Sequence, residues 1–131
     1  MRRVAALAVA ALVPACAGGD GEVAIACHLA GRSSVERPLG EERTLDLDEG
    51  LSVATTVGEL AWEGLHTDTE AEGRVLTVQV TELDGDRPVA SHLFQLDGPP
   101  ANDFRGGHGF TGLVYAYAAS GAELQWWCTS A

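Results

Sequence analysis

Apolar and polar residues alternate along most of this chain, and that alternation constrains its fold more than any other feature. Successive side chains of a β-strand point to opposite faces, so a period of two predicts a strand with one buried face. The segment 74–83 is the clearest case, with Leu76, Val78 and Val80 expected to point inward. Similar patterns predict strands at 23–29, 44–47, 51–57, 60–62, 89–96, 113–118 and 122–128.

Turn residues such as Asp84-Gly85-Asp86 separate these short runs, and no amphipathic helix is expected. Seven or eight short strands of this kind favour an all-β fold. We expect an antiparallel β-sandwich, with a small β-barrel as the alternative. No internal repeat or second domain is visible, so residues 22–131 are expected to form a single β domain.

The last two predicted strands can be aligned residue by residue. A two-residue turn at Ser120-Gly121 places Tyr115 opposite Trp126. That register puts both tyrosines of the chain and Trp126 on a wholly apolar face, which we expect to face the core. It leaves Val114 and Trp127 together on the opposite face.

The first sixteen residues carry an export signal. Arg2 and Arg3 precede an apolar run, residues 4–13, of about ten residues, whereas a membrane-spanning helix needs about twenty. Small residues then lead to a cysteine, and Val13-Pro14-Ala15-Cys16 resembles the lipobox of bacterial lipoproteins. The resemblance implies cleavage before Cys16 and attachment of lipid to its thiol.

The implied mature protein is a membrane-anchored lipoprotein of the bacterial cell envelope, which touches the membrane only through its lipid. Residues 1–15 are then the signal peptide, and 16–21 the lipidated cysteine with a glycine-rich tether. Pro14 stands where the lipobox has a small or apolar residue other than proline. An alternative is cleavage at Ala15-Cys16-Ala17, an A-x-A site, which would release a soluble periplasmic or secreted protein.

Two cysteines remain for the domain, Cys27 and Cys128. An even pair in an exported chain predicts a disulfide, because exported proteins fold in oxidising compartments. The bond would join the first strand to the last. It would close a loop of about 100 residues, worth up to about 4.7 kcal/mol on a chain-entropy estimate.

The formal charge is −11, and all eight basic residues are arginines. Loss of Arg2 and Arg3 with the signal makes the mature chain more acidic still. Such a surface argues against nucleic acid and against anionic lipid as partners, because both repel negative charge. It is compatible with a basic protein partner or with metal cations.

Candidate binding residues gather around Trp127 and the segment 97–112. An exposed tryptophan beside apolar neighbours is a typical binding hot spot, although the segment 97–112 could instead fold over it. Loops of that length are usually functional or mobile, and its glycines could let backbone amides approach a ligand. The candidate binding residues are Phe104, Arg105, His108, Phe110, Val114 and Trp127.

No catalytic, cofactor or metal site is predicted. His108 is a lone histidine with Asp103 as its only local acid, no GxSxG occurs, and paired cysteines leave no thiol nucleophile. The four histidines lack zinc-site spacing. The carboxylates at 46–49 and 84–86 suit turns, and neither group matches an EF-hand.

These features predict a non-enzymatic, lipid-anchored envelope domain that binds a protein or another envelope component. A small-ligand or calcium-binding module is the alternative. Inhibition of a basic lytic enzyme is a further alternative, because lysozyme-inhibitor lipoproteins share the plan of lipid anchor, small β domain and disulfide. The sequence leaves the partner, the membrane leaflet and the oligomeric state open.

Overall fold

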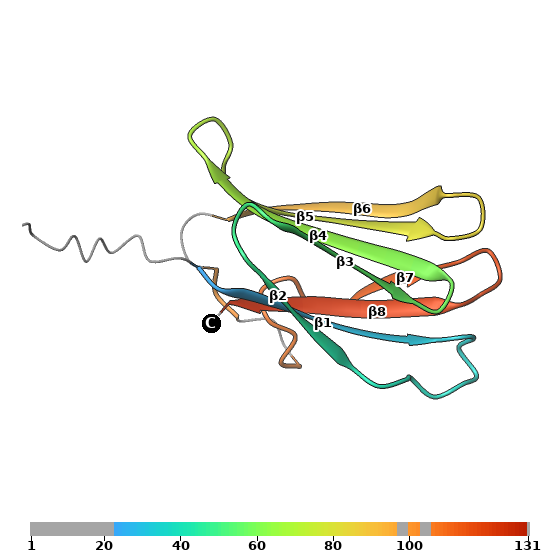
Figure 1. Cartoon of the computed structure of the whole chain (residues 1–131). Coiled ribbons are helices and arrows are strands. Elements are labelled where there is room, and N and C mark those ends of the chain that lie inside the picture. The colour runs from blue at the N-terminus through green and yellow to red at the C-terminus, as the bar shows by residue number, and fades with distance from the viewer. Residues whose placement is uncertain (1–22, 97–99, 103–105, 131) are drawn as a thin grey trace, which may run out of the picture.

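Two four-stranded antiparallel sheets pack face to face in a β-sandwich (Figure 1). The computed structural model describes residues 23–96, 100–102 and 106–130. Sheet A has the strand order β2-β1-β8-β7 and sheet B the order β3-β4-β5-β6. In chain order the strands are β1 (Ile25–Arg32), β2 (Arg43–Leu47), β3 (Ser52–Val57), β4 (Leu60–Thr69), β5 (Gly73–Glu82), β6 (Arg87–Leu96), β7 (Val114–Tyr117) and β8 (Glu123–Ser130). The predicted sandwich is confirmed.

The largest difference from the predicted strands is the length of β4. The sequence predicts residues 60–62, whereas the strand continues to Thr69. Gly64 and His66 occupy inward positions that apolar residues usually fill, so the alternating pattern fades after Trp62. A Cβ on Gly64 would lie 2.4 Å from the Trp62 ring, which shows that the indole fills the space beside this glycine.

The core lies between the two sheets and is centred on Trp126. Its ring meets those of Trp62 and Phe94 edge-on, each at a centroid distance of 6.1 Å, and that of His92 at 5.6 Å. The inward faces predicted for the first strand and for 74–83 are confirmed: Leu76 and its alternate neighbours are fully buried. Each buried side chain of this size stabilises the fold by about 1.5–3 kcal/mol.

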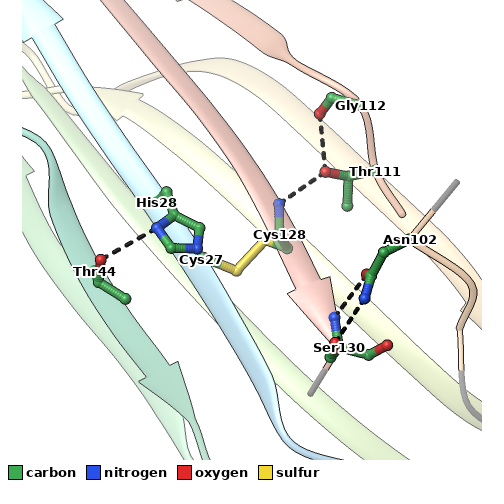
Figure 2. The surroundings of a disulfide bond; sticks show 8 residues. All are labelled: Cys27, His28, Thr44, Asn102, Thr111, Gly112, Cys128 and Ser130. Atoms are coloured by element: carbon green, nitrogen blue, oxygen red, sulfur yellow. Dashed lines mark hydrogen bonds between the residues drawn. A yellow bond between two sulfur atoms is a disulfide. The ribbon is translucent and has the colours of Figure 1, made fainter. Parts of the chain in front are cut away.

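The predicted disulfide is confirmed, and it lies within sheet A. Cys27 of β1 faces Cys128 of β8 in direct register, and the two sulfurs are bonded and fully buried (Figure 2). The bond therefore ties the first strand to the last across neighbouring positions of one sheet.

The turn between β7 and β8 has three residues, one more than predicted. Ala118 N donates to Ala122 O (2.8 Å), and Gly121 N donates to Ala118 O (3.0 Å). Gly121 has a φ of +92°, a left-handed conformation that glycine adopts without strain and that closes such three-residue loops. The extra residue shifts the hairpin register by one position.

The predicted assignment of faces on β7 is therefore wrong. Val114 pairs with Trp126 and packs against the core, so it does not share a face with Trp127. Tyr115 and Tyr117 point outward, and each is 48% exposed. A one-residue shift moves every side chain of a strand to the other face, which is why both tyrosines change places with their neighbours.

Two carboxylates hold this turn, Glu82 at the end of β5 and Glu59 in the β3–β4 turn. Glu82 accepts a hydrogen bond from Ala119 N (3.0 Å) and forms an ion pair with Arg87. Glu59 accepts one from Ser120 Oγ. The Arg87 guanidinium, followed by the Ala119 amide, holds the pKa of Glu82 below its ordinary value of 4.5. These contacts link the two sheets at the end of the sandwich far from the start of β1 (Figure 1).

Candidate functional site

The outer face of sheet A gathers the exposed aromatic side chains of the molecule's C-terminal hairpin. We call it the aromatic face and define it by seven residues of β1, β7 and β8. These are His28, Arg32, Tyr115, Tyr117, Glu123, Gln125 and Trp127. Trp, Tyr and Arg are the residue types most enriched at binding hot spots, so this composition suits recognition of a partner.

A partly buried ion pair lies at one end of the aromatic face. The Arg32 guanidinium binds the carboxylate of Glu123, whose side chain is only 1% exposed. Tyr117 Oη and Gln125 Nε2 also donate to this carboxylate, at 3.2 and 3.3 Å. Burial raises the pKa of Glu123, but the three hydrogen bonds together outweigh burial and hold the pKa below its ordinary value of 4.5. Tyr117 is thereby fixed in an outward orientation.

Trp127 lies between two histidines on the same face. The His28 ring stacks on it at a centroid distance of 3.9 Å, and the His108 ring meets it edge-on at 5.6 Å. His28 Nδ1 in turn lies 3.1 Å from Thr44 Oγ1 and 3.3 Å from Glu42 Oε1. Trp127 is half-buried, and the segment that carries His108 does cover part of it. The aromatic face is thus a packed, pre-ordered surface.

The described residues of the connection from β6 to β7, 100–102 and 106–113, lie along the end of β8 that β7 does not pair with. Thr111 Oγ1 accepts a hydrogen bond from Cys128 N (2.9 Å) and donates one to Gly112 O, as Figure 2 shows. Asn102 exchanges two side-chain hydrogen bonds with the Ser130 backbone, at 2.7 and 2.9 Å. These contacts hold residues 102 and 111 of the crossover against β8.

Gly109 allows the crossover to lie this close to β8. A Cβ at this position would lie 2.1 Å from Cys128 O, and the residue has a φ of +61°. Any other residue would displace the segment and its hydrogen bond from Phe110 N to Cys128 O (3.0 Å). The close backbone approach expected of these glycines is therefore made to the protein's own strand.

The structure brings only some of the predicted candidates together. Trp127 and His108 are in contact on the aromatic face. Phe110 packs against the core and meets the Phe94 ring edge-on at 6.4 Å, and Val114 also packs against the core. Phe104 and Arg105 lie outside the described residues.

A second feature, a groove at one end of the sandwich, has no counterpart in the sequence predictions. It has a volume of about 660 Å³ and lies between the end of β1, the start of β2 and the β3–β4 turn. We call it the acidic groove and define it by residues 31–33, 40–43 and 57–59 and by Ala122. Its residues are too far apart in sequence to form a recognisable motif.

His66 is the one fully buried histidine among the described residues, and neither ring nitrogen has a hydrogen-bond partner there. Burial lowers its pKa below the ordinary value of 6.5, and Arg74 lowers it further, while Glu49 and Asp68 oppose this shift. In the described part of the chain, His, Cys, Asp and Glu form no group of three or more that could hold a metal ion.

Comparisons of the chain with protein-family models, curated proteins and solved structures find no match. Within the described ranges, no helix is long and apolar enough to cross a membrane.

Proposed function

We propose that this protein is an exported, lipid-anchored domain without enzymatic activity, which binds a protein or another envelope component through the aromatic face. The lipobox-like signal supports the anchor, and the disulfide is consistent with an oxidising compartment. The acidic surface suits a basic partner, and a basic lytic enzyme is one such target.

The observation that carries this proposal is the exposure of Tyr115 and Tyr117. Both tyrosines of the chain lie on one outer face, and each is 48% exposed. An aromatic ring gains most from burial, so neighbouring half-exposed rings are an available source of binding energy. The packed Trp127 and the Arg32–Glu123 pair beside them give the surface a fixed shape, which reduces the entropy lost on binding.

The test is quantitative capture of envelope partners by variants of the mature protein. We expect Tyr115→Ala/Tyr117→Ala to weaken capture by about tenfold or more, because hot-spot aromatics each contribute at least about 1–2 kcal/mol. Tyr115→Ala alone serves as a second variant, since Tyr115 makes no hydrogen bond with the described residues and its loss should leave the fold intact.

Leu93→Ala is the matched control. Leu93 is 66% exposed and lies on the outer face of sheet B, away from the aromatic face. The proposal requires the control to capture the same partners as the unaltered protein. Equal capture by the tyrosine variants and the unaltered protein would show that the aromatic face is not the binding surface.

A further inference from the structure

The acidic groove has the size of a ligand site and fixed walls. Its volume of about 660 Å³ lies within the range of about 300–1,000 Å³ that is common for ligand pockets. One wall is held by a hydrogen bond from Gly40 N to Gly31 O (2.8 Å) and by another from Arg32 Nη1 to Arg37 O (3.2 Å). The groove is therefore part of the folded structure.

The floor of the groove is made of small and apolar residues. A Cβ on Gly31 would lie 2.5 Å from Val57 Cγ1, so β1 and β3, which belong to different sheets, approach closely here. Gly40, Gly58 and Ala122 add no long side chain to the lining. A ligand in this space would meet apolar surface below and charged side chains at the rim.

The two cations of the rim are already bound to the protein. Arg32 pairs with Glu123, outside the groove. Arg43 Nη1 donates to Thr56 O (2.6 Å) and Thr55 Oγ1 (3.1 Å), and so bridges from β2 to the edge of β3. Arg43 makes no ion pair with the described residues, so its charge offsets one of the three carboxylates of the rim.

The three carboxylates of the rim have weaker partners. Glu59 binds the Ser120 hydroxyl, and Glu42 lies 3.3 Å from His28. Glu41 has no hydrogen bond or ion pair with the described residues. Three carboxylates against the one unpaired guanidinium of Arg43 leave the groove with a net negative charge, and the charge of the whole chain has the same sign.

The groove also lies at the end of the sandwich away from the start of β1. β1 begins at Ile25, four residues after Gly21, the last residue of the proposed tether, and reaches the groove at Arg32. Eight strand residues span about 26 Å, so an anchored domain would present the groove far from the membrane. This step rests on the proposed lipid anchor.

From these observations we propose that the acidic groove binds an arginine or lysine side chain of a protein partner. The carboxylates at the rim receive the cationic group, and the floor of glycines, Val57 and Ala122 receives its apolar stem. Most of the lining is exposed to solvent, so a small free ligand would stay largely wet, whereas the body of a partner protein would cover the opening. The side chain enters beside the aromatic face, because Arg32 and Glu42 connect the two surfaces.

The probes are acetyl-Gly-Arg-Gly-amide and its citrulline counterpart, which has nearly the same shape and no charge. Each is titrated into the ¹⁵N-labelled mature protein, with its disulfide intact, in a neutral detergent. We expect the arginine peptide to shift the amide signals of Gly31, Gly40, Gly58 and Ala122, with a dissociation constant on the order of 1 mM for one side chain. The citrulline peptide should cause little change.

Two triple variants separate the groove from general attraction to an acidic protein. The variant Glu41→Gln/Glu42→Gln/Glu59→Gln should lower the affinity for the arginine peptide by about two- to fivefold for each carboxylate lost. Glu63→Gln/Glu70→Gln/Glu72→Gln removes the same charge from β4 and the β4–β5 turn, away from the groove, and should bind as the unaltered protein does.

Three outcomes would overturn the proposal. In the first, the citrulline peptide binds as well as the arginine peptide; in the second, both triple variants weaken binding equally. Either result would show that the charge of the groove does not cause the binding. Free butylguanidinium could bind as tightly as the peptide, which would make the groove a small-cation site. The peptide measurements do not involve Tyr115 or Tyr117. A negative result for the acidic groove would therefore leave the proposed function of the aromatic face to its own test.

Discussion

The seating of the β6–β7 crossover on β8 predicts a large loss of stability from Gly109→Ala. Three costs contribute. An alanine in left-handed backbone costs about 1–2 kcal/mol. Its Cβ, 2.1 Å from Cys128 O, also forces apart the hydrogen bonds from Phe110 N to Cys128 O and from Cys128 N to Thr111 Oγ1. At about 0.5–1.5 kcal/mol for each bond, the total is about 2–5 kcal/mol.

Gly107→Ala is a control with the same backbone strain and no steric conflict. Gly107 has a φ of +73°, and nothing lies within 4 Å of the Cβ position. This variant should lose only the backbone cost of about 1–2 kcal/mol. Both variants lower the entropy of the unfolded chain equally, so that effect cancels in the comparison.

Urea unfolding of both variants, with the disulfide intact, measures the difference directly. We expect Gly109→Ala to be the less stable of the two by about 1–3 kcal/mol, the contribution of the two hydrogen bonds. Equal losses would refute the reasoning, because they would mean that the crossover is not held against β8 and does not position His108 on Trp127.

Four further predictions address other parts of the molecule. Reduction of Cys27–Cys128 should lower the free energy of unfolding by up to about 4.7 kcal/mol in urea titrations with and without reductant, and a change below about 1 kcal/mol would contradict the chain-entropy argument. The pKa of His66 is lowered in the folded state, so the unfolded chain binds the proton first and the stability should fall as the pH drops below 6.5. His66→Leu should make the melting temperature less dependent on pH in this range, and an unchanged pH dependence would refute this role of His66. Arg32→Met should raise the pKa of Glu123 and destabilise the folded protein by about 1–3 kcal/mol, because a buried carboxylate loses its cation. NMR titration of the carboxyl group measures this pKa, and an unchanged value would contradict the pairing. Intact mass spectrometry of the mature protein should find Cys16 at the N-terminus carrying lipid, and an unmodified Cys16 would contradict the lipobox interpretation.

The sequence was sufficient to predict the sandwich because its strands obey a period of two. In β5 the inward residues Leu76, Val78 and Val80 are all fully buried, and Val75 is the one apolar residue on the opposite face. The pattern is weaker where contacts between distant side chains determine the residue type. Position 64 requires a glycine because the Trp62 ring fills the space beside it, and this contact is seen only in the folded structure. Local periodicity therefore located the strands better than it located their ends.

The candidate site was only partly predictable. The sequence pattern correctly predicts Trp127 on the outer face of sheet A. It wrongly predicts the exposed tyrosines in the core, because the expected turn before β8 is one residue shorter than the observed turn. Gly121 did not decide the loop length, because a glycine in the last turn position fits both a two-residue and a three-residue loop. The acidic groove had no local signal, because sheet packing alone brings Gly31, Gly40 and Gly58 together.

Site-specific photocrosslinking in the cells that make the protein is the most direct test of the proposed function. A photoreactive amino acid at Tyr115 reports contacts of the aromatic face, and the same group at Leu93 reports contacts of the opposite sheet. We predict a discrete crosslinked partner from position 115 and none from position 93. The same products from both positions, or a partner from position 93 alone, would contradict a binding function for the aromatic face.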